Sequence, residues 1–316
     1  MFPKLFAESG LSLDRLKALV AVGAAGSIVR ASAGDPVRQS QYSRQIKELE
    51  DFFHTRLIER HGKGVRLTPG GKELARISRF FLLGLSNFQR GGMKEEQIYR
   101  IGAASTFISQ ILLPVLADAR SIKSGIRYSV ETVGDDDIER RLHDLTLDFG
   151  VVMRSSLSRP LQSKELGTWN LKLWVPKELF KNARHALEAF QDGRMPWIFP
   201  LGEFPLQESS KFMAGEPHLS CNSFIESRTA SQEHGLAMIL PDFLSPPESS
   251  GAFVNVRIPS IQKLTFQYRL AWNPRLLRLN QHADRRREYL LKSLASKMHA
   301  LSPQRMKTRS SKSTDR

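Results

Sequence analysis

Cysteine is almost absent from this sequence: the 316-residue chain has one, Cys221, and therefore cannot form an internal disulfide. The residues before Leu13 contain no long apolar stretch behind a positive charge, which argues against a secretory signal and for a reducing cytoplasm. No apolar run approaches the roughly 18 residues that a membrane-spanning helix needs. We therefore expect a soluble, cytoplasmic protein with no membrane partner.

Signatures of catalysis and of metal binding are also missing. The 8 histidines show no metal-ligand spacing, and a single cysteine excludes zinc-finger schemes. The sequence has neither a P-loop nor a Gly-x-Ser-x-Gly elbow. Cys221, near His218 and His234, is either a reactive thiol or a structural one. We expect no metal, no cofactor and no catalytic residue, hence not an enzyme; an enzyme that uses Cys221 is the alternative, which Cys221→Ala tests.

Positive charge is concentrated at the two ends of the chain. Residues 1–92 carry 15 Lys and Arg against 8 Asp and Glu, a net of +7, and residues 275–316 carry 12 against 3, a net of +9. Residues 93–274 carry 20 against 21, a net of −1. Charge that served only solubility would spread evenly, so the distribution favours a polyanion partner at the ends.

The segment from residue 39 to residue 53 predicts an amphipathic helix whose polar face suits DNA. Its apolar side chains recur three and four residues apart and form one stripe that faces a core: Tyr42, Ile46, Leu49 and Phe53. The opposite face offers short donors and acceptors for base edges, then cations for phosphates: Gln39, Ser40, Gln41, Ser43, Arg44 and Lys47. A solvated surface helix has the same pattern, so the neighbouring segments must decide.

Two shorter helices precede this one. Ser12 can cap a helix that begins at Leu13 and ends near residues 23–26. Ser27 can cap a second, which must stop by Pro36 because proline disfavours helical geometry in the residue before it. The third helix then starts close to Arg38. This is the order of a helix-turn-helix, whose second element enters the major groove with its N-terminal end.

A short basic hairpin follows these helices. Residues 57–60 and 65–68 are strand-like, and residues 61–64 between them include two glycines, which allow the positive φ values of hairpin loops. Lys63 at the tip is free to reach a minor groove or a phosphate. The sequence therefore predicts a winged helix-turn-helix over residues 11–68.

A long helix is predicted next, over residues 69–92, with Thr68 as its cap and Pro69 at its first position. Its small and apolar residues alternate three and four apart, a spacing that suits a partner helix: Leu74, Ile77, Phe81, Gly84 and Phe88. We expect a linker helix through which two copies dimerise; packing within its own chain is the alternative.

Residues 11 to about 92 resemble the N-terminal domain of LysR-type transcriptional regulators. The positions in register with that family are Gly26-Ser27, Arg30-Ala31, Val37, Gln39, residues 43–46, Leu49-Glu50, residues 57–60, Gly62, residues 64–68 and Gly70-Gly71. The chain departs from the pattern at Asp35, Arg38 and Ser40, and Asp35 is a candidate cap for the recognition helix. The resemblance implies that DNA is contacted by Gln39, Ser40, Ser43 and Arg44 on this helix and by Lys63 on the wing. Arg38, although it departs from the pattern, is a further candidate for a DNA contact.

Strands alternate with helices beyond residue 93, which predicts a mostly parallel α/β sheet. Strands are expected at residues 99–104, 127–131 and 147–152, with a helix over residues 107–116 and another after the acidic residues 135–137. Ser105 and Thr106 follow the first strand, at a place where anions and polar ligands bind. Capping of the helix without a ligand is the alternative role.

This part also resembles the effector domain of the LysR family, in which two α/β subdomains joined by crossing strands hold a small ligand, as in periplasmic binding proteins. The similarity runs through residues 101–103, Pro114, residues 147–150 and residues 235–241. It implies a cleft lined by Ala104, Ser105, Thr106, Pro200, Leu201 and Ser223. We expect the effector domain to span residues 93–301, ending in a basic helix around Tyr289, Leu290, Leu294 and Met298.

The last residues, 302–316, contain one bulky apolar side chain, Met306, and are expected to be disordered. Their basic charge suits either nonspecific phosphate contacts or solubility.

These observations predict a multidomain protein with an all-α winged helix-turn-helix head, a long linker helix and a two-subdomain α/β domain. The expected function is that of a bacterial, cytoplasmic and nucleoid-associated transcription regulator. Its expected partners are double-stranded DNA with a partly palindromic operator, a small-molecule effector, a second or further copies of itself in a homodimer or homotetramer, and RNA polymerase. The alternative is an architectural DNA-binding protein whose α/β domain serves only oligomerisation. A metabolite that shifts the DNA footprint or the melting temperature would distinguish the two.

Overall fold

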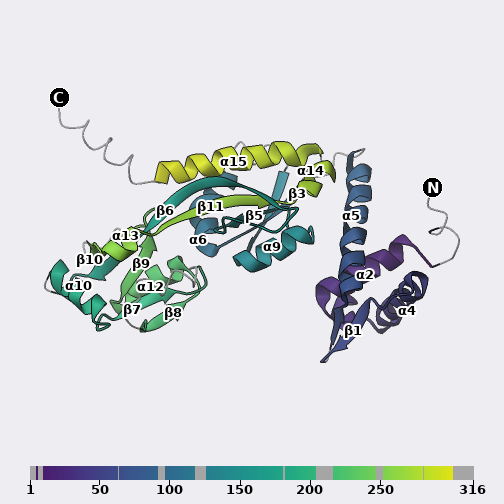
Figure 1. Ribbon diagram of the computed structural model, residues 1–316, viewed down its shortest axis with the longest axis horizontal. Helices are drawn as coiled ribbons and strands as arrows, with labels where there is room; N and C mark the ends of the chain where they lie inside the picture. Colours follow the sequence, from purple (N-terminus) through teal and green to yellow (C-terminus); the bar gives the residue numbers. More distant parts are fainter. Residues whose placement is uncertain are drawn as a thin grey trace. The chain divides into compact units, whose positions relative to one another are not determined.

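The computed structural model describes residues 5, 10–62, 64–91, 97–117, 126–180, 182–203, 216–246, 252–279 and 281–301. The chain forms two compact units, and the main division between them falls at residue 95 (Figure 1). Lys63 and the tail 302–316, for which the sequence made predictions, lie outside the described residues. Within the described part, no helix is long and apolar enough to cross a membrane.

The first unit begins with the three helices of a helix-turn-helix. The first, α2 (Leu13–Ala25), is capped by the hydroxyl of Ser12 and ends at Gly26, whose φ of 61° suits glycine. α3 (Ile28–Ala31) follows, with the hydroxyl of Ser27 as its cap. These local signals behave as the sequence predicted.

The third helix, α4 (Pro36–Phe53), starts two residues earlier than expected. The cause is Asp35, whose carboxylate accepts hydrogen bonds from the amides of Val37 and Arg38 at 2.9 and 3.4 Å. Pro36 occupies the first helical position, where its missing N–H leaves nothing unsatisfied. Asp35 is therefore the cap of α4, as the sequence suggested.

The predicted hairpin and linker helix are both present. Strands β1 (Ile58–His61) and β2 (Gly64–Leu67) pair antiparallel, with Ile58 opposite Leu67. The next helix, α5 (Pro69–Gly91), is capped by the hydroxyl of Thr68, which accepts the amide of Gly71 at 3.0 Å. Residue 71 must be glycine, because a Cβ atom there would lie 1.9 Å from the carbonyl oxygen of Leu57.

One small core holds this unit together. Its buried members come from α2, α4, α5 and the start of the hairpin: Leu16, Leu19, Leu49, Leu57 and Ala75. Phe53, Leu67, Leu74 and Leu82 pack against them. The core thus joins the recognition helix to the first turns of the linker helix.

The second unit is built on a nine-stranded sheet with the order β4-β3-β5-β11-β6-β9-β7-β8, and β10 pairs with β6. Its first subdomain contains β3 (Gln97–Ala103), β4 (Ile126–Thr132) and β5 (Phe149–Val152), with β4 and β5 parallel to β3. Between β3 and β4 lies a continuous helical segment, α6 (Ser105–Phe107), η1 (Ile108–Leu112) and α7 (Leu113–Leu116). All four residues of β5 are buried, as is typical of a parallel strand covered on both faces.

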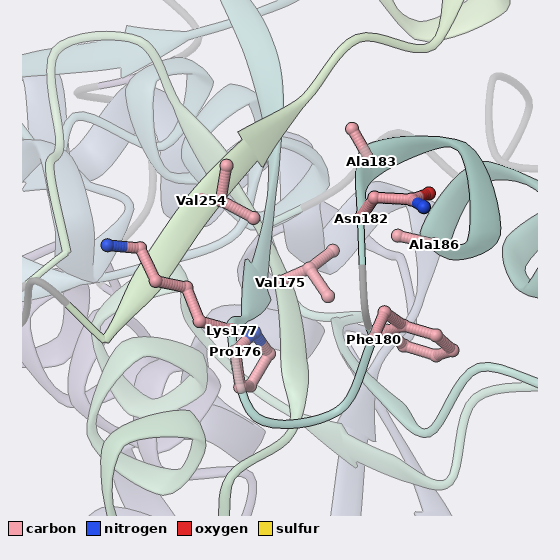
Figure 2. Close-up of a pocket in the computed structure, with 8 residues that line it drawn as sticks. All are labelled: Val175, Pro176, Lys177, Phe180, Asn182, Ala183, Ala186 and Val254. Atoms are coloured by element: carbon pink, nitrogen blue, oxygen red, sulfur yellow. The ribbon is translucent and has the colours of Figure 1, made fainter.

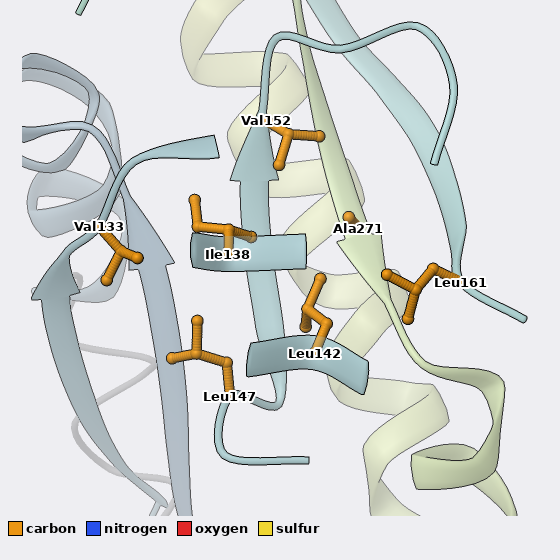
Figure 3. Close-up of a cluster of buried hydrophobic side chains, with 7 residues drawn as sticks. All are labelled: Val133, Ile138, Leu142, Leu147, Val152, Leu161 and Ala271. Carbon is orange, nitrogen blue, oxygen red and sulfur yellow. The ribbon is translucent and has the colours of Figure 1, made fainter. Parts of the chain in front are cut away.

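Helix α9 (Asp135–His143) closes the core of this first subdomain. Ile138 and Leu142 project from it toward β5, and Val133, Leu147, Val152, Leu161 and Ala271 complete the cluster (Figure 3). The approach is close, since a Cβ atom on Gly150 would lie 2.2 Å from the Cγ2 atom of Ile138.

Two long strands, β6 (Gln162–Pro176) and β11 (Thr265–Trp272), connect the two subdomains. They run antiparallel beside each other, and β6 continues into the second subdomain, where it pairs with β9 (Ala237–Pro241) and β10 (Phe253–Val256) (Figure 1). The second subdomain also contains β7 (Trp197–Pro200), β8 (Leu219–Cys221), α10 (Ala183–Gln191), α12 (Phe224–His234) and α13 (Pro259–Gln262). This confirms the predicted architecture of two α/β subdomains joined by crossing strands.

The chain's last described helix, α15 (Gln281–Leu301), follows α14 (Pro274–Leu279) and contains the residues around which the sequence predicts a basic helix. It buries Ala283, Leu290, Leu294 and Met298, three of which the sequence named. Met298 lies 3.4 Å from where a Cβ atom of Gly167 in β6 would be, and Arg287 lies over the ring of Trp272 in β11. The helix therefore packs along the crossing strands.

Candidate nucleic-acid interface and effector cleft

The polar face of α4 is at the surface, as the sequence predicted. On its opposite face Ile46 and Leu49 are 0% exposed, and Tyr42 and Phe53 are half-buried. The exposed side chains are Arg38, Ser40, Gln41, Ser43, Arg44 and Lys47, and Gln39 is half-buried. Short polar groups thus lie at the N-terminal end of the helix and cations follow, an arrangement that can meet base edges and phosphates.

Three polar contacts fix α4 against its neighbours. The side chains of Arg15 in α2 and Glu48 in α4 are 2.5 Å apart. The carboxylate of Glu50, at the end of α4, accepts hydrogen bonds from the amides of Leu57 at 2.7 Å and Ile58 at 3.2 Å. The recognition helix and the hairpin are therefore held in one geometry, which a reading surface requires.

The hairpin is also anchored to the end of α2. The amide of Val65 donates to the carbonyl of Gly26 at 3.2 Å, and a Cβ atom on Gly64 would lie 2.8 Å from the same oxygen. The glycine at residue 64 thus permits a close approach between hairpin and helix.

Val37 is a surface feature that the sequence did not single out as a contact. It lies in the first turn of α4 and is 75% exposed. An exposed aliphatic side chain at the N-terminal end of a recognition helix can contact the methyl group of thymine. The sequence could have indicated this residue, because Val37 is apolar but lies outside the stripe of apolar residues that faces the core.

The linker helix α5 presents an apolar stripe to the surface. Ile77, Phe81 and Phe88 are 50%, 48% and 87% exposed, and Leu85 between them is 41% exposed. Leu74, which the sequence placed in the same stripe, instead packs against the core of the head. Leu74 lies on the same side of α5 as the exposed residues but in its first turns, which the core of the head covers, and Leu85 extends the exposed part of the stripe. Dimerisation through these residues stays a prediction.

The expected effector residues meet at the boundary between the two subdomains. Thr106 is completely buried, and both its amide and its hydroxyl are engaged in hydrogen bonds. Ser223 is 2% exposed and caps α12 by accepting the amide of Glu226. Ser105 is half-buried, and its carbonyl accepts the hydroxyl of Ser109 at 3.1 Å. Ser223 thus caps a helix. The capping role that the sequence offered as an alternative for Ser105 and Thr106 is not seen, because Ala104 precedes α6 and no side chain caps that helix.

The partner of Thr106 is Glu203, a residue that the sequence did not suggest. Its carboxylate accepts the Thr106 amide at 2.7 Å, the Thr106 hydroxyl at 2.5 Å and the Phe224 amide at 2.9 Å. Glu203 is 6% exposed, and burial raises the pKa of its carboxyl, although the three donors act in the opposite direction. Burial, followed by the nearby carboxylates of Glu203 and Asp135, also raises the pKa of Tyr268 well above its usual value.

Cys221 is half-buried at the end of β8, and its thiol lies 3.3 Å from the carbonyl oxygen of Ser223. Burial raises the pKa of this thiol to about 11, so it stays protonated at neutral pH. This favours the structural role over the reactive one. Among the described residues, no group of three His, Cys, Asp or Glu side chains is placed to hold a metal ion.

Two hollows lie in the second subdomain. One, of about 260 Å³, is lined mainly by aliphatic and aromatic side chains, with Val175 of β6 and Val254 of β10 opposite Phe180 and Ala186 (Figure 2). The other, of about 470 Å³, is lined by Asn170, Leu171, Lys172, Asp242, Asn255 and Arg257. Neither is lined by Thr106, Glu203 or Ser223.

Comparison with known families matches both parts of the chain. Residues 13–72 match the family described as "Bacterial regulatory helix-turn-helix protein, lysR family", and residues 94–293 match the "LysR substrate binding domain". The chain belongs to the LysR family of bacterial regulatory proteins. The resemblance seen in the sequence is thereby confirmed for the head and for the α/β domain.

Curated relatives of this LysR-family chain are named as transcriptional regulators. It is 24% identical over 258 residues to HdfR of Yersinia enterocolitica, a match that covers 79% of this chain and 88% of that protein. It is 24% identical over 203 residues to the uncharacterised regulator YfeR of Shigella flexneri, a match that covers 59% of this chain and 66% of that protein. The match therefore spans just under two thirds of the length of YfeR.

Solved structures share the fold of this LysR-family chain. ArgP from Mycobacterium tuberculosis is similar with a TM-score of 0.62 at 19% identity, over 86% of this chain and 97% of that one. Full-length LysG from Corynebacterium glutamicum with bound effector Arg is similar with a TM-score of 0.57 at 17% identity, over 86% of this chain and 98% of that one. Full-length CbnR complexed with its target DNA is similar with a TM-score of 0.52 at 16% identity, over 87% of this chain and 99% of that one.

Proposed function

We propose that this LysR-family protein regulates transcription by reading a DNA operator with α4 and adjusts that reading to a small molecule in its α/β domain. The observation that carries the proposal is the exposed polar face of α4, held beside the hairpin by Glu50 and backed by the buried Ile46 and Leu49. A helix that was merely solvated would not require a hairpin fixed next to it.

The base-reading residues are those at the N-terminal half of α4. Gln39, Ser40 and Ser43 have side chains that can donate to and accept from base edges, and Arg44 suits guanine or a phosphate. Arg38 is 65% exposed and stands 3.6 Å from the carboxylate of Asp35, so it is available for a phosphate. Val37 adds an apolar contact, and Lys63, which stands between the two hairpin strands in the sequence, is expected to contact the minor groove or the backbone.

Two heads are needed for a partly palindromic operator, and the exposed stripe of α5 supports dimer formation. Four large apolar side chains at 77, 81, 85 and 88 lie along one side of this helix. A second copy of α5 would bury them as a helix pair does. Assembly of dimers into a tetramer and contact with RNA polymerase complete the partners that we expect of a regulator.

The effector domain, residues 93–301, takes its ligand at the boundary between the two subdomains. Support comes from the meeting of Thr106 and Ser223 there, and from the similar LysG structure, which was solved with bound effector Arg. A change in closure between the subdomains would alter the spacing of paired heads, and hence the half-sites they read. The head is assigned to residues 11–68 and the linker helix to residues 69–92.

The proposal is tested by selecting genomic DNA fragments on the purified full-length protein and sequencing those retained. We expect an enriched, partly symmetric motif, and a duplex carrying it should bind at least roughly 10³-fold more tightly than a scrambled duplex at physiological salt. Equal affinity for both duplexes at every salt concentration would refute the reading of a specific operator and would favour the alternative, an architectural DNA-binding protein. Absence of binding even at low salt would refute DNA binding itself.

A further inference from the structure

A carboxylate of the protein itself lies at the boundary where the sequence placed a ligand. Glu203 follows β7 in the second subdomain, 97 residues after Thr106 of the first. It accepts two hydrogen bonds from Thr106 and one from the Phe224 amide at the start of α12. One side chain therefore joins the first turns of two helices, one from each subdomain.

The surroundings of this carboxylate are those of a carboxylate-binding site. Three donors converge on its two oxygens, and the residue is 6% exposed. The turn that carries it is held close to the second subdomain, because a Cβ atom on Gly202 would lie 2.4 Å from the carbonyl oxygen of Asn222. Backbone amides at the start of a helix favour a negatively charged group nearby. The carboxylate of Glu203 accepts hydrogen bonds from two such amides and from the Thr106 hydroxyl.

We propose that Glu203 is a tethered ligand of the effector cleft, which holds the two subdomains together in the absence of a small molecule and which a carboxylate-bearing effector must displace. This inference rests on the proposed sensing function. A tethered group competes at an effective concentration on the order of millimolar or higher. Because only molecules whose Glu203 has left the site can bind, the apparent affinity of the wild-type protein for a free carboxylate is low.

The first test is chemical rescue. Glu203→Ala removes a CH2–COO⁻ group, which has the size and charge of acetate. We expect the melting temperature of the full-length variant to fall by roughly 5 °C or more, since three buried hydrogen bonds are lost. Acetate at tens of millimolar should then restore about 2–5 °C beyond the effect of potassium chloride at equal ionic strength.

Two matched variants show whether the rescue belongs to this site. Glu203→Gln fills the same volume, so its melting temperature should not respond to acetate. Glu226→Ala removes a neighbouring exposed carboxylate that accepts the Asn222 amide, and it too should show no acetate-specific shift. A folded Glu203→Ala protein that responds to acetate no more than to chloride overturns the proposal.

The wild-type protein provides a second test that does not depend on the folding of a variant. The amides of Thr106 and Phe224 both donate to Glu203, so peptides spanning these residues should be slow to exchange hydrogen without any added ligand. Rapid exchange that only added acetate slows would show an open cleft and overturn the proposal.

These outcomes are distinguishable from failure of the proposed function. Binding of the selected duplex is measured on the same samples and depends on α4, whereas the acetate response and the exchange rates depend on the α/β domain. A protein that binds its operator but shows no acetate-specific rescue refutes the tethered ligand alone. A protein that shows the rescue but binds no DNA refutes the regulator function.

Discussion

Replacement of Arg44 by alanine provides a direct test of the recognition helix. The side chain is 74% exposed and stands 3.8 Å from the carboxylate of Glu48, one turn later on α4. An exposed pair of this kind contributes about 0.3–0.5 kcal/mol. Glu48 also keeps Arg15 as its nearer partner at 2.5 Å, so Arg44→Ala should leave the melting temperature nearly unchanged.

The effect on DNA binding should be larger and depends on what Arg44 touches. If the guanidinium binds a base, the specific operator should lose about 1–3 kcal/mol of binding free energy and the scrambled duplex much less. If it binds only a phosphate, both duplexes should weaken, and the slope of log K against log salt should decrease in magnitude by about one. Fluorescence anisotropy with a labelled duplex at several salt concentrations separates these two cases.

Arg184→Ala is a matched control, because Arg184 in α10 is 86% exposed and pairs with Glu188 one turn later at 3.1 Å. It removes the same charge from a different part of the chain, so operator affinity should stay within about twofold. If Arg44→Ala and Arg184→Ala bind alike, in both affinity and salt slope, our placement of the reading face is wrong.

Three further predictions concern assembly, packing and the thiol. Phe88→Asp places a charge in the exposed stripe of α5 and should shift the protein toward monomer in sedimentation velocity, whereas Lys72→Asp, on the opposite side of the helix, should not; identical profiles would reject the stripe as an interface. Gly71→Ala should lower the free energy of unfolding of the head by at least about 1–3 kcal/mol, because the new Cβ atom would meet the Leu57 carbonyl at 1.9 Å; Gly134→Ala, with nothing within 4 Å, should be neutral in the same urea titration. Cys221, whose pKa is raised from 9.0 to about 11, should react slowly with a disulfide reagent at pH 8 and roughly tenfold faster in urea, because the larger thiolate fraction outweighs the lower nucleophilicity of each thiolate. The sign follows from burial: the folded state holds the thiol proton more tightly, so the thiol favours folding below pH 9 and loses that contribution as the pH rises toward 11. Equal rates in native and unfolded protein would refute this environment.

The sequence predicts the helix starts and the hairpin of the head because each depends on contacts between residues only a few positions apart. Ser12, Ser27 and Thr68 cap helices by accepting hydrogen bonds from amides three residues further on, and Gly62, with a φ of 54°, suits the hairpin loop. Helix α4 begins at Pro36, two residues before the position near Arg38 that the sequence predicts, because Asp35 and Pro36 together start it. Where a cap and a proline stand together, the helix begins at the proline.

Leu74 and Leu85 show where periodicity reaches its limit. Both fit a three-and-four pattern on α5, but the core of the head covers Leu74 and leaves Leu85 41% exposed. The two residues are about 20° apart around the helix axis and therefore share one stripe. The core of the head covers the first turns of α5 and leaves the later turns exposed, and the sequence pattern does not show where along the helix that cover ends.

The sequence by itself determined the order of the elements, the face of α4 that meets the core and the family of the chain, because these depend on short-range spacing of apolar, capping and turn residues. Only the tertiary structure brought Glu203 to Thr106 and Phe224, across 97 and 21 residues of chain. No periodic pattern marks a lone acidic residue in a turn as the partner of two helix starts. Such a contact is created by the crossing strands β6 and β11, which set the two subdomains face to face.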